Sequence, residues 1–162
     1  MTRPSPLQPR EFFSGTWTGE GELRFESLGG LFRRPERFRY QSRVRWLTQA
    51  RSKYTDVLEF ESGRKLEIPF VSEIVDEQRL RVTSPDMPGG ADVRLSKDGY
   101  TYSPYLIVMR IGPFRFHVKC TDANVIDPDG LIHDRVEMTW LGLRVATLTM
   151  TIRVDRSPTG RS

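Results

Sequence analysis

The sequence has few of the residues on which disulfide frameworks and metal sites depend. Its 162 residues include one cysteine, Cys120, and two histidines, His117 and His133. A single cysteine excludes an internal disulfide and fits a reducing compartment. The histidines lack the spacing of a zinc site, and the sequence contains no Gly-x-Ser-x-Gly elbow and no phosphate-binding glycine loop. We therefore expect no cofactor and no metal.

Long apolar runs are also missing. No stretch approaches the roughly 18 consecutive apolar residues of a membrane-spanning helix. The first ten residues contain three prolines and no apolar core of the kind found in signal peptides. We expect a cytoplasmic protein without a membrane span. The net charge of +4 permits an anionic partner without requiring one.

The clearest pattern in the chain is an alternation of apolar and polar residues, which begins near Trp17. The residues Trp17, Gly19, Gly21 and Leu23 fall on one face, and threonine and glutamate fall between them. A period of two predicts a strand with one buried face. Glycines on that buried face indicate a bend or a close backbone approach, as a barrel-closing strand requires.

The same pattern recurs to the end of the chain, punctuated by turn residues. We predict strands at about 15–27, 36–47, 52–61, 65–75, 79–84, 91–96, 100–111, 114–125, 131–141 and 144–154, with loops between them. Residues 85–90 form the clearest loop, a short turn or helix at 10–14 could cap the base, and 28–32 is either a lid or a plain loop. This spacing predicts an all-β protein, an antiparallel up-and-down β-barrel of about ten strands. We expect one domain over 11–156, a disordered lead at 1–10 and a disordered tail at 157–162.

Two motifs resemble known barrel families. Gly15-x-Trp17 resembles the start of the calycin superfamily, which includes lipocalins and fatty-acid-binding proteins. The longer Gly15-x-Trp17-x-Gly19-x-Gly21 is similar to nitrobindin, a ten-stranded haem-binding barrel. The segment Asp134-Arg135-Val136-Glu137-Met138-Thr139-Trp140-x-Gly142 is similar to bacterial lipocalin-like proteins. These resemblances imply a calycin-like barrel, closed at one end by Trp17 with Arg153 or Arg156 packed over it.

The resemblance to nitrobindin also implies a histidine near the C-terminal end of the barrel. No histidine follows His133, and both histidines fall in outward phase. Haem binding is therefore an alternative rather than the main prediction.

Strand phase predicts which side chains point into the barrel. Asp122 shares its phase with Cys120, and Asp134 shares its phase with Val136, so the two aspartates should face each other across the 127–130 turn. Two carboxyls in an apolar interior repel, which raises the pKa of one of them. The residues predicted to line a ligand site are Tyr40, Trp46, Tyr54, Asp56, Phe70, Tyr102, Phe116, Asp122, Asp134 and Trp140.

Several functions remain open on this evidence. The main prediction is a small hydrophobic or amphipathic ligand in the interior, although aromatic side chains could instead fill the core and the carboxyls could lie at a wet rim. One alternative is an isomerase, cyclase or hydratase with Asp122 and Asp134 as catalytic residues. Another is an anionic-partner module that uses the basic run from Arg33 to Lys53. We expect that run to be a solvated strand face paired with Glu36, Glu59 and Glu61, without specific nucleic-acid binding.

Overall fold

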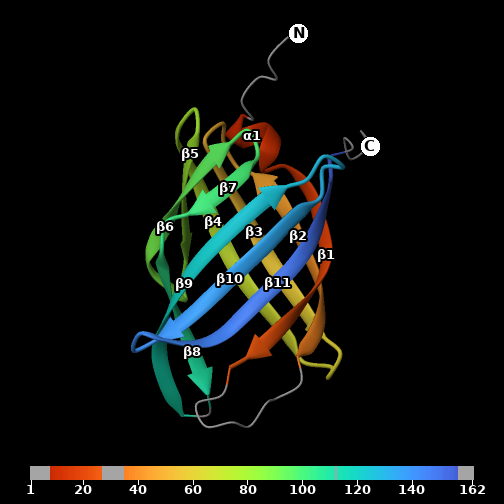
Figure 1. The fold of residues 1–162 in the computed structure, drawn as a ribbon. Helices are drawn as coiled ribbons and strands as arrows, with labels where there is room; N and C mark the ends of the chain where they lie inside the picture. Colours follow the sequence, from red (N-terminus) through yellow and green to blue (C-terminus); the bar gives the residue numbers. More distant parts are fainter. Residues whose placement is uncertain (1–7, 27–34, 112, 157–162) are drawn as a thin grey trace.

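The computed structural model describes residues 8–26, 35–111 and 113–156, and these residues are almost entirely β-structure (Figure 1). The elements are α1 (Pro9–Phe12), β1 (Gly15–Phe25), β2 (Glu36–Trp46), β3 (Arg51–Phe60), β4 (Lys65–Asp76), β5 (Arg79–Ser84), β6 (Met87–Ser96), β7 (Gly99–Tyr102), β8 (Tyr105–Ile111), β9 (Phe114–Ile126), β10 (Ile132–Trp140) and β11 (Leu143–Asp155). Three predicted segments lie outside the described residues: the lid or loop at 28–32, the tail at 157–162 and residues 1–7 of the lead. Pro9 and Arg10, which are also part of the predicted lead, belong to α1.

The strands form a closed antiparallel barrel, which confirms the predicted fold class. Each strand from β1 to β7 pairs with the next, β7 pairs with β9, β9 with β10, β10 with β11, and β11 returns to β1. This ring contains ten strands, and β8 is an additional strand paired with β9. Closure leaves the ring without a free edge along most of its wall.

Two of the predicted strand boundaries differ from the structure, for local reasons. The predicted strand at 100–111 is two strands, because Pro104 lacks the backbone N–H that a continuous ladder needs. Both pieces pair with β9, β7 beside its C-terminal half and β8 beside its N-terminal half. The predicted loop at 85–90 is also shorter than expected, since β6 begins at Met87 and includes Gly89 and Gly90.

The two glycines on the buried face of β1 allow the last strand to approach closely. A Cβ atom at Gly19 would lie 2.4 Å from the carbonyl oxygen of Thr151, and one at Gly21 would lie 2.3 Å from that of Thr149. A Cβ at Gly21 would also lie 2.6 Å from the ring of Phe38. Glycine at these positions therefore permits β1 to pair with β11 and close the barrel.

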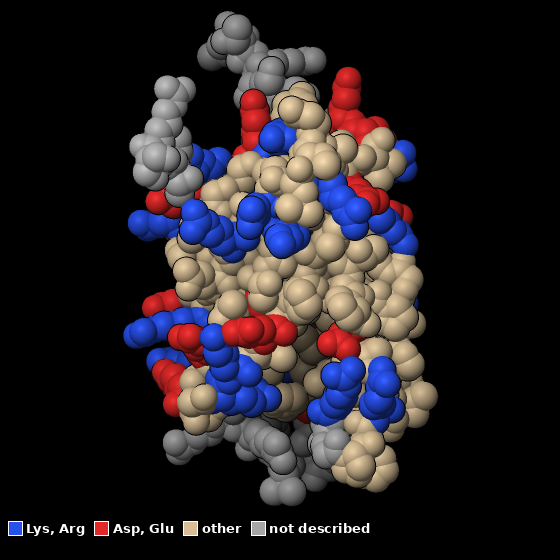
Figure 2. Space-filling model, turned by 180° about the vertical axis from the view of Figure 1, so that it is seen from behind, with Lys and Arg blue, Asp and Glu red and all other residues tan. Residues whose placement is uncertain are grey.

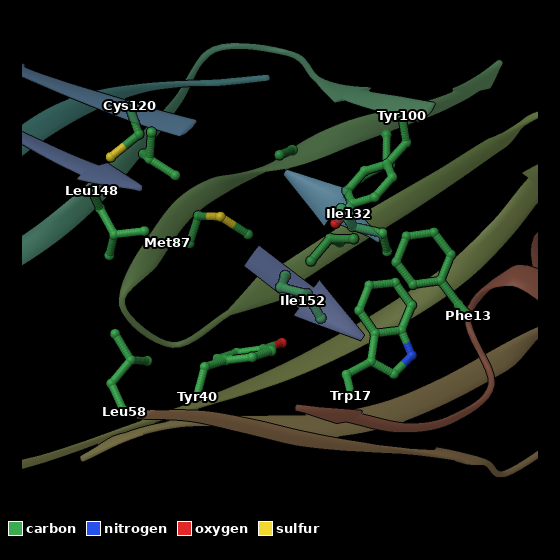
Figure 3. Close-up of a cluster of buried hydrophobic side chains, with 14 of the residues drawn as sticks. Phe13, Trp17, Tyr40, Leu58, Met87, Tyr100, Cys120, Ile132, Leu148 and Ile152 are labelled. Atoms are coloured by element: carbon green, nitrogen blue, oxygen red, sulfur yellow. The ribbon is translucent and has the colours of Figure 1, made fainter. Parts of the chain in front are cut away.

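Aromatic rings fill the end of the barrel that α1 covers (Figures 1 and 3). The ring of Phe13 stacks on Trp17 at 5.5 Å between centroids, and Phe12 meets Trp17 edge-on at 5.6 Å. Tyr100 packs edge-on against Phe12 and Phe13 at 5.2 and 5.6 Å. The indole Nε1 of Trp46 donates a hydrogen bond to the Phe13 carbonyl oxygen at 2.8 Å and so attaches β2 to this cap. This end of the barrel is closed.

The wall of the barrel is interrupted between β4 and β8. The pairing of β4 with β5 begins only at Val71, so the first half of β4 pairs with β3 alone. Among the described strands β8 pairs only with β9. A space-filling view from behind shows a hollow low on the molecule (Figure 2). Residues on both sides of the interruption, including Leu66, Ile68, Ile107 and Met109, line the internal cavity.

None of the helical structure within the described ranges has the length and apolarity to cross a membrane.

Candidate functional site

The barrel contains a cavity of about 400 Å³ between the aromatic cap and the interruption in the wall. Apolar side chains from most strands line it, among them Leu58, Phe60, Met87 and Leu148. Leu58, Met87 and Leu148 converge on the interior in Figure 3. Its size falls within the roughly 300–1,000 Å³ that is usual for small-molecule sites. The interior is therefore hollow, with room for a compact organic molecule.

One carboxyl group enters this cavity from β3. Asp56 lies opposite Ser42 of β2, and the Tyr40 hydroxyl donates a hydrogen bond to its Oδ1 at 3.0 Å. Burial raises the pKa of Asp56 to about 6, and the hydrogen bond from Tyr40 opposes that shift by favouring the ionised form. This carboxyl group can therefore change its protonation state near neutral pH.

Two more carboxyl groups enter from the opposite wall of the ring. Asp122 on β9 and Asp134 on β10 are diagonal neighbours, because Asp134 pairs with Asn124 and Asp122 pairs with Val136. Asn124 Nδ2 donates a hydrogen bond to Asp122 Oδ1 at 2.5 Å, and the Tyr105 hydroxyl donates to Asp122 Oδ2 at 3.4 Å. Asp122 is thus held by neutral donors.

The two neighbouring carboxyls do not ionise alike. Burial raises the pKa of Asp122 to about 6, and the hydrogen bond with Asp134 opposes that shift. Burial also raises the pKa of Asp134 well above its usual value, and the adjacent charge of Asp122 and the hydrogen bond with it add to the increase. Asp134 therefore holds the proton of the pair and Asp122 is the first to ionise.

Several buried tyrosines lie near the three carboxyl groups. Tyr100 stands between the walls, and burial and the nearby charges of Asp134, Asp122 and Asp56 all raise its pKa. Its ring contacts Tyr102 at 5.9 Å, which in turn contacts Tyr105 at 5.8 Å. These phenols remain neutral and present hydroxyl groups and ring faces to the cavity.

Seven of the ten residues predicted for a ligand site line this single cavity. They come from six different strands, and they are Tyr40, Tyr54, Asp56, Phe70, Tyr102, Asp122 and Asp134. The alternation of period two was sufficient to place them on the inner face.

The other three predicted residues lie away from the cavity. Trp46 belongs to the aromatic cap, where its indole holds Phe13. Trp140 is 38% exposed and packs against Phe116 at 5.7 Å between ring centroids. Trp140 is the last residue of β10 and lies beyond Met138, which does line the cavity. The strand stays in register with β9 through Thr139, and the extra residue in its pairing with β11 is Val145 of β11. Phe116 lies near the start of β9, beside Trp140 and below the cavity.

Sequence reasoning missed several lining residues on β6 and β8. Met87 and Tyr105 line the cavity, as do Ile107 and Met109. Tyr102 and Tyr105 both face inward although they are three residues apart, because the chain bends at Pro104 between β7 and β8. The proline was the one signal in the sequence that the phase would change there.

The arginine beside the aromatic cap is Arg156. Its guanidinium lies 5.5 Å from the centroid of the Phe12 ring, and its Nη2 donates a hydrogen bond to the Phe12 carbonyl oxygen at 3.3 Å. Arg153 is exposed on β11 and pairs in register with Thr18, on the outer face of β1. Arg156 therefore packs over Phe12 of the aromatic cap, whereas the lipocalin resemblance implies an arginine over Trp17.

Neither histidine faces the cavity. His133 is exposed on β10, with Nε2 2.9 Å from Asp127 Oδ2, and His117 is exposed on β9. The residues present therefore do not fit a haem held by a histidine inside this barrel. Cys120 does face the interior, but burial raises the pKa of its thiol to about 12, so the reactive thiolate is suppressed.

The outer face carries the basic run. Figure 2 shows a row of basic side chains across the upper part of the molecule. Arg43, Arg45 and Lys53 line a wide external depression of about 1500 Å³. The ion pairs near this run differ from those predicted, since Arg51 pairs with Glu73 at 3.5 Å and Glu36 pairs with Arg64 at 2.8 Å. The depression is open to solvent, so the smaller internal cavity is the better-defined site.

Comparison with known proteins supports the fold and assigns no activity. No family model matches the sequence, and no curated protein matches it. The crystal structure of Rv2717c from M. tuberculosis is similar, with a TM-score of 0.60 and 14% identity over 89% of this chain and 93% of that chain. The S-type phycobiliprotein lyase CPES from Guillardia theta is similar at a TM-score of 0.58 and 8% identity, over 94% and 95% of the two chains. The chain therefore has a lipocalin-like barrel fold.

Proposed function

We propose that this protein binds one small amphipathic molecule inside its barrel. The observation that supports this most strongly is the cavity of about 400 Å³, closed at one end by the aromatic cap and lined by apolar walls. A few polar side chains, chiefly Asp56, Asp122 and Asp134, also line these walls. An apolar pocket with a small number of convergent polar groups is the usual form of a small-molecule site.

The free-energy cost of burying these carboxyl groups supports a role for them in ligand binding. Burying a carboxyl group in an apolar interior destabilises a fold unless the charge is paired. Asp134 Oδ1 is buried and lacks a hydrogen-bond partner among the described residues. A polar group of a ligand would satisfy this atom, whereas a core selected for stability alone would place an apolar residue there.

Binding of a neutral fluorescent probe tests the proposal. N-phenyl-1-naphthylamine should bind with one-to-one stoichiometry, with a blue shift and a rise in emission. Val118→Phe enlarges a buried side chain that lines the cavity on β9, so it should weaken binding about tenfold, equivalent to ~1.4 kcal/mol. Val125→Phe makes the same change at an exposed position on the same strand and should leave binding unchanged.

The comparison of the two variants decides the result. Overpacking costs roughly 1–3 kcal/mol of stability, so the folded state of Val118→Phe is checked by its unfolding transition. If wild-type protein fails to bind the probe, or if folded Val118→Phe binds it as well as Val125→Phe does, the interior site is wrong.

A second candidate function is proton-transfer catalysis, such as isomerisation, cyclisation or hydration. The hydrogen-bonded pair of Asp122 and Asp134 favours it, because one carboxyl holds a proton while the other ionises near neutral pH. On that reading Asp134→Asn abolishes turnover of a bound substrate and leaves its affinity nearly intact.

A further inference from the structure

The balance of charge inside the cavity points to the kind of ligand it takes. Three carboxyl groups face the interior, whereas the only basic residues in the described lining are Arg64 and Arg110. Both arginines are more than half exposed and already paired, Arg64 with Glu36 at 2.8 Å and Arg110 with Asp86 at 3.1 Å. Within the part of the chain that the structure describes, the interior carboxyls therefore have no counter-ion.

The described side chains that donate hydrogen bonds to Asp56 and Asp122 are all neutral. The hydroxyl of Tyr40 donates to Asp56, and the hydroxyl of Tyr105 and the amide of Asn124 donate to Asp122. Such donors stabilise a carboxylate locally but leave its charge in place. Asp134 is only 7% exposed, and its Oδ1 accepts no hydrogen bond from the described residues. A donor that also carries positive charge would complete this cluster.

The rings around the carboxyls suit the same kind of group. Tyr100, Tyr102 and Tyr105 form a chain of ring contacts beside Asp122, and Tyr54 of β3 stacks on its cross-strand neighbour Phe70 of β4 at 5.1 Å in the cavity wall. Aromatic faces attract an organic cation through their quadrupole. A metal ion fits less well, because the described residues include no group of three or more histidine, cysteine, aspartate or glutamate side chains that could hold one.

We propose that the cavity selects an organic cation: a compact amphipathic molecule whose protonated nitrogen lies beside Asp122 and Asp134 and faces Asp56 on the opposite wall. Its apolar body occupies the space beside Leu58 and Leu148. This inference rests on the proposed function, and it specifies the ligand class. An anionic ligand, such as a fatty acid, would add a like charge to the carboxyl cluster and is disfavoured. A neutral ligand of the same shape binds without the ionic contribution.

Three indoles of similar size but different charge test this selectivity by isothermal titration calorimetry at pH 7. Tryptamine carries an ammonium group, tryptophol a neutral hydroxyl and indole-3-propionate a carboxylate. We expect tryptamine to bind at least about tenfold more tightly than tryptophol, since a charge-assisted hydrogen bond is about twice as strong as a neutral one. Indole-3-propionate should bind more weakly than either.

Variants assign the preference to the carboxyls. Asp122→Asn keeps the shape and removes the charge of the ionised member of the pair, so the affinities for tryptamine and tryptophol should converge. Asp56→Asn provides the same measurement from the opposite wall if Asp122→Asn does not fold. Asp98→Asn, in the exposed turn between β6 and β7, should retain the full preference.

The outcomes separate this inference from the function on which it rests. Three results would overturn the cation selectivity and leave the interior site intact. They are equal binding of tryptamine and tryptophol, tighter binding of indole-3-propionate, and binding of N-phenyl-1-naphthylamine without any binding of tryptamine. Loss of N-phenyl-1-naphthylamine binding as well would overturn the proposed function itself. A preference for tryptamine that persists in both Asp122→Asn and Asp56→Asn would remove the carboxyls from the explanation.

Discussion

Replacing Trp17 with alanine should destabilise the protein by about 3–5 kcal/mol, the usual range for truncating a large buried aromatic side chain. Trp17 is 4% exposed and packs against three rings, those of Phe12, Phe13 and Tyr100. Its indole Nε1 also donates a hydrogen bond to the Ser14 carbonyl oxygen at 3.2 Å. Removing it leaves a void between α1 and the strand that closes the barrel. Equilibrium urea denaturation measures the effect as a lower midpoint at an unchanged slope.

The matched control is another tryptophan. Trp140 contacts Phe116 at the far end of β10 but is partly exposed, so Trp140→Ala should cost only about 1 kcal/mol, the value of an aromatic pair. If Trp17→Ala and Trp140→Ala shifted the denaturation midpoint equally, the aromatic cap would not hold the closed end together.

The second large effect is on the pH dependence of stability. Burial raises the pKa of Asp56 to about 6, well above its value in the unfolded chain. Between these two pKa values the folded state binds more protons, so the contribution of Asp56 to stability is full below about pH 4 and is lost as pH rises through about 6. The protein should therefore be less stable at pH 8 than at pH 5. Asp56→Asn should raise its unfolding free energy at pH 8 by roughly 3 kcal/mol, since each pKa unit is worth ~1.4 kcal/mol.

Asparagine suits this test because its side-chain oxygen can still accept the hydrogen bond from Tyr40. The measurement is urea denaturation of wild type and Asp56→Asn at several values between pH 5 and pH 8, with Asp98→Asn as the exposed control. The two curves should converge toward pH 4 and separate as pH rises, whereas Asp98→Asn should follow wild type throughout. A wild-type stability that rises from pH 5 to pH 8 would show that the interior carboxyls are solvated or paired.

The fold was predictable because one simple pattern covers most of it. Alternating apolar and polar residues, punctuated by turns such as that at Gly130, give the number and order of the strands and their inward faces. The glycines of β1 indicated the close approach that closes the barrel. These features are local, so a single sequence contains them.

The errors fall where the period of two is interrupted or where a strand runs past the cavity. Tyr105 joined the inner face after the bend at Pro104, and Trp140 lies at the end of β10, beyond the lining residue Met138. How far a cavity extends along a strand depends on the neighbouring strands, which the sequence of one strand does not specify. The sequence could place Asp122 and Asp134 on one face, but their diagonal offset is set by the register of β9 with β10. The gap between β4 and β8 is likewise a property of the assembled ring.

Native mass spectrometry of the protein, purified without detergent from the organism that produces it, tests the central claim most directly. If the barrel is a ligand-binding protein with an acidic cavity, the folded protein should carry one small molecule with a basic nitrogen, which is released on denaturation. Added N-phenyl-1-naphthylamine, titrated into the same preparation, shows whether an interior complex survives the measurement. A spectrum with only the mass of the bare chain, under conditions that preserve the complex with N-phenyl-1-naphthylamine, would contradict the claim.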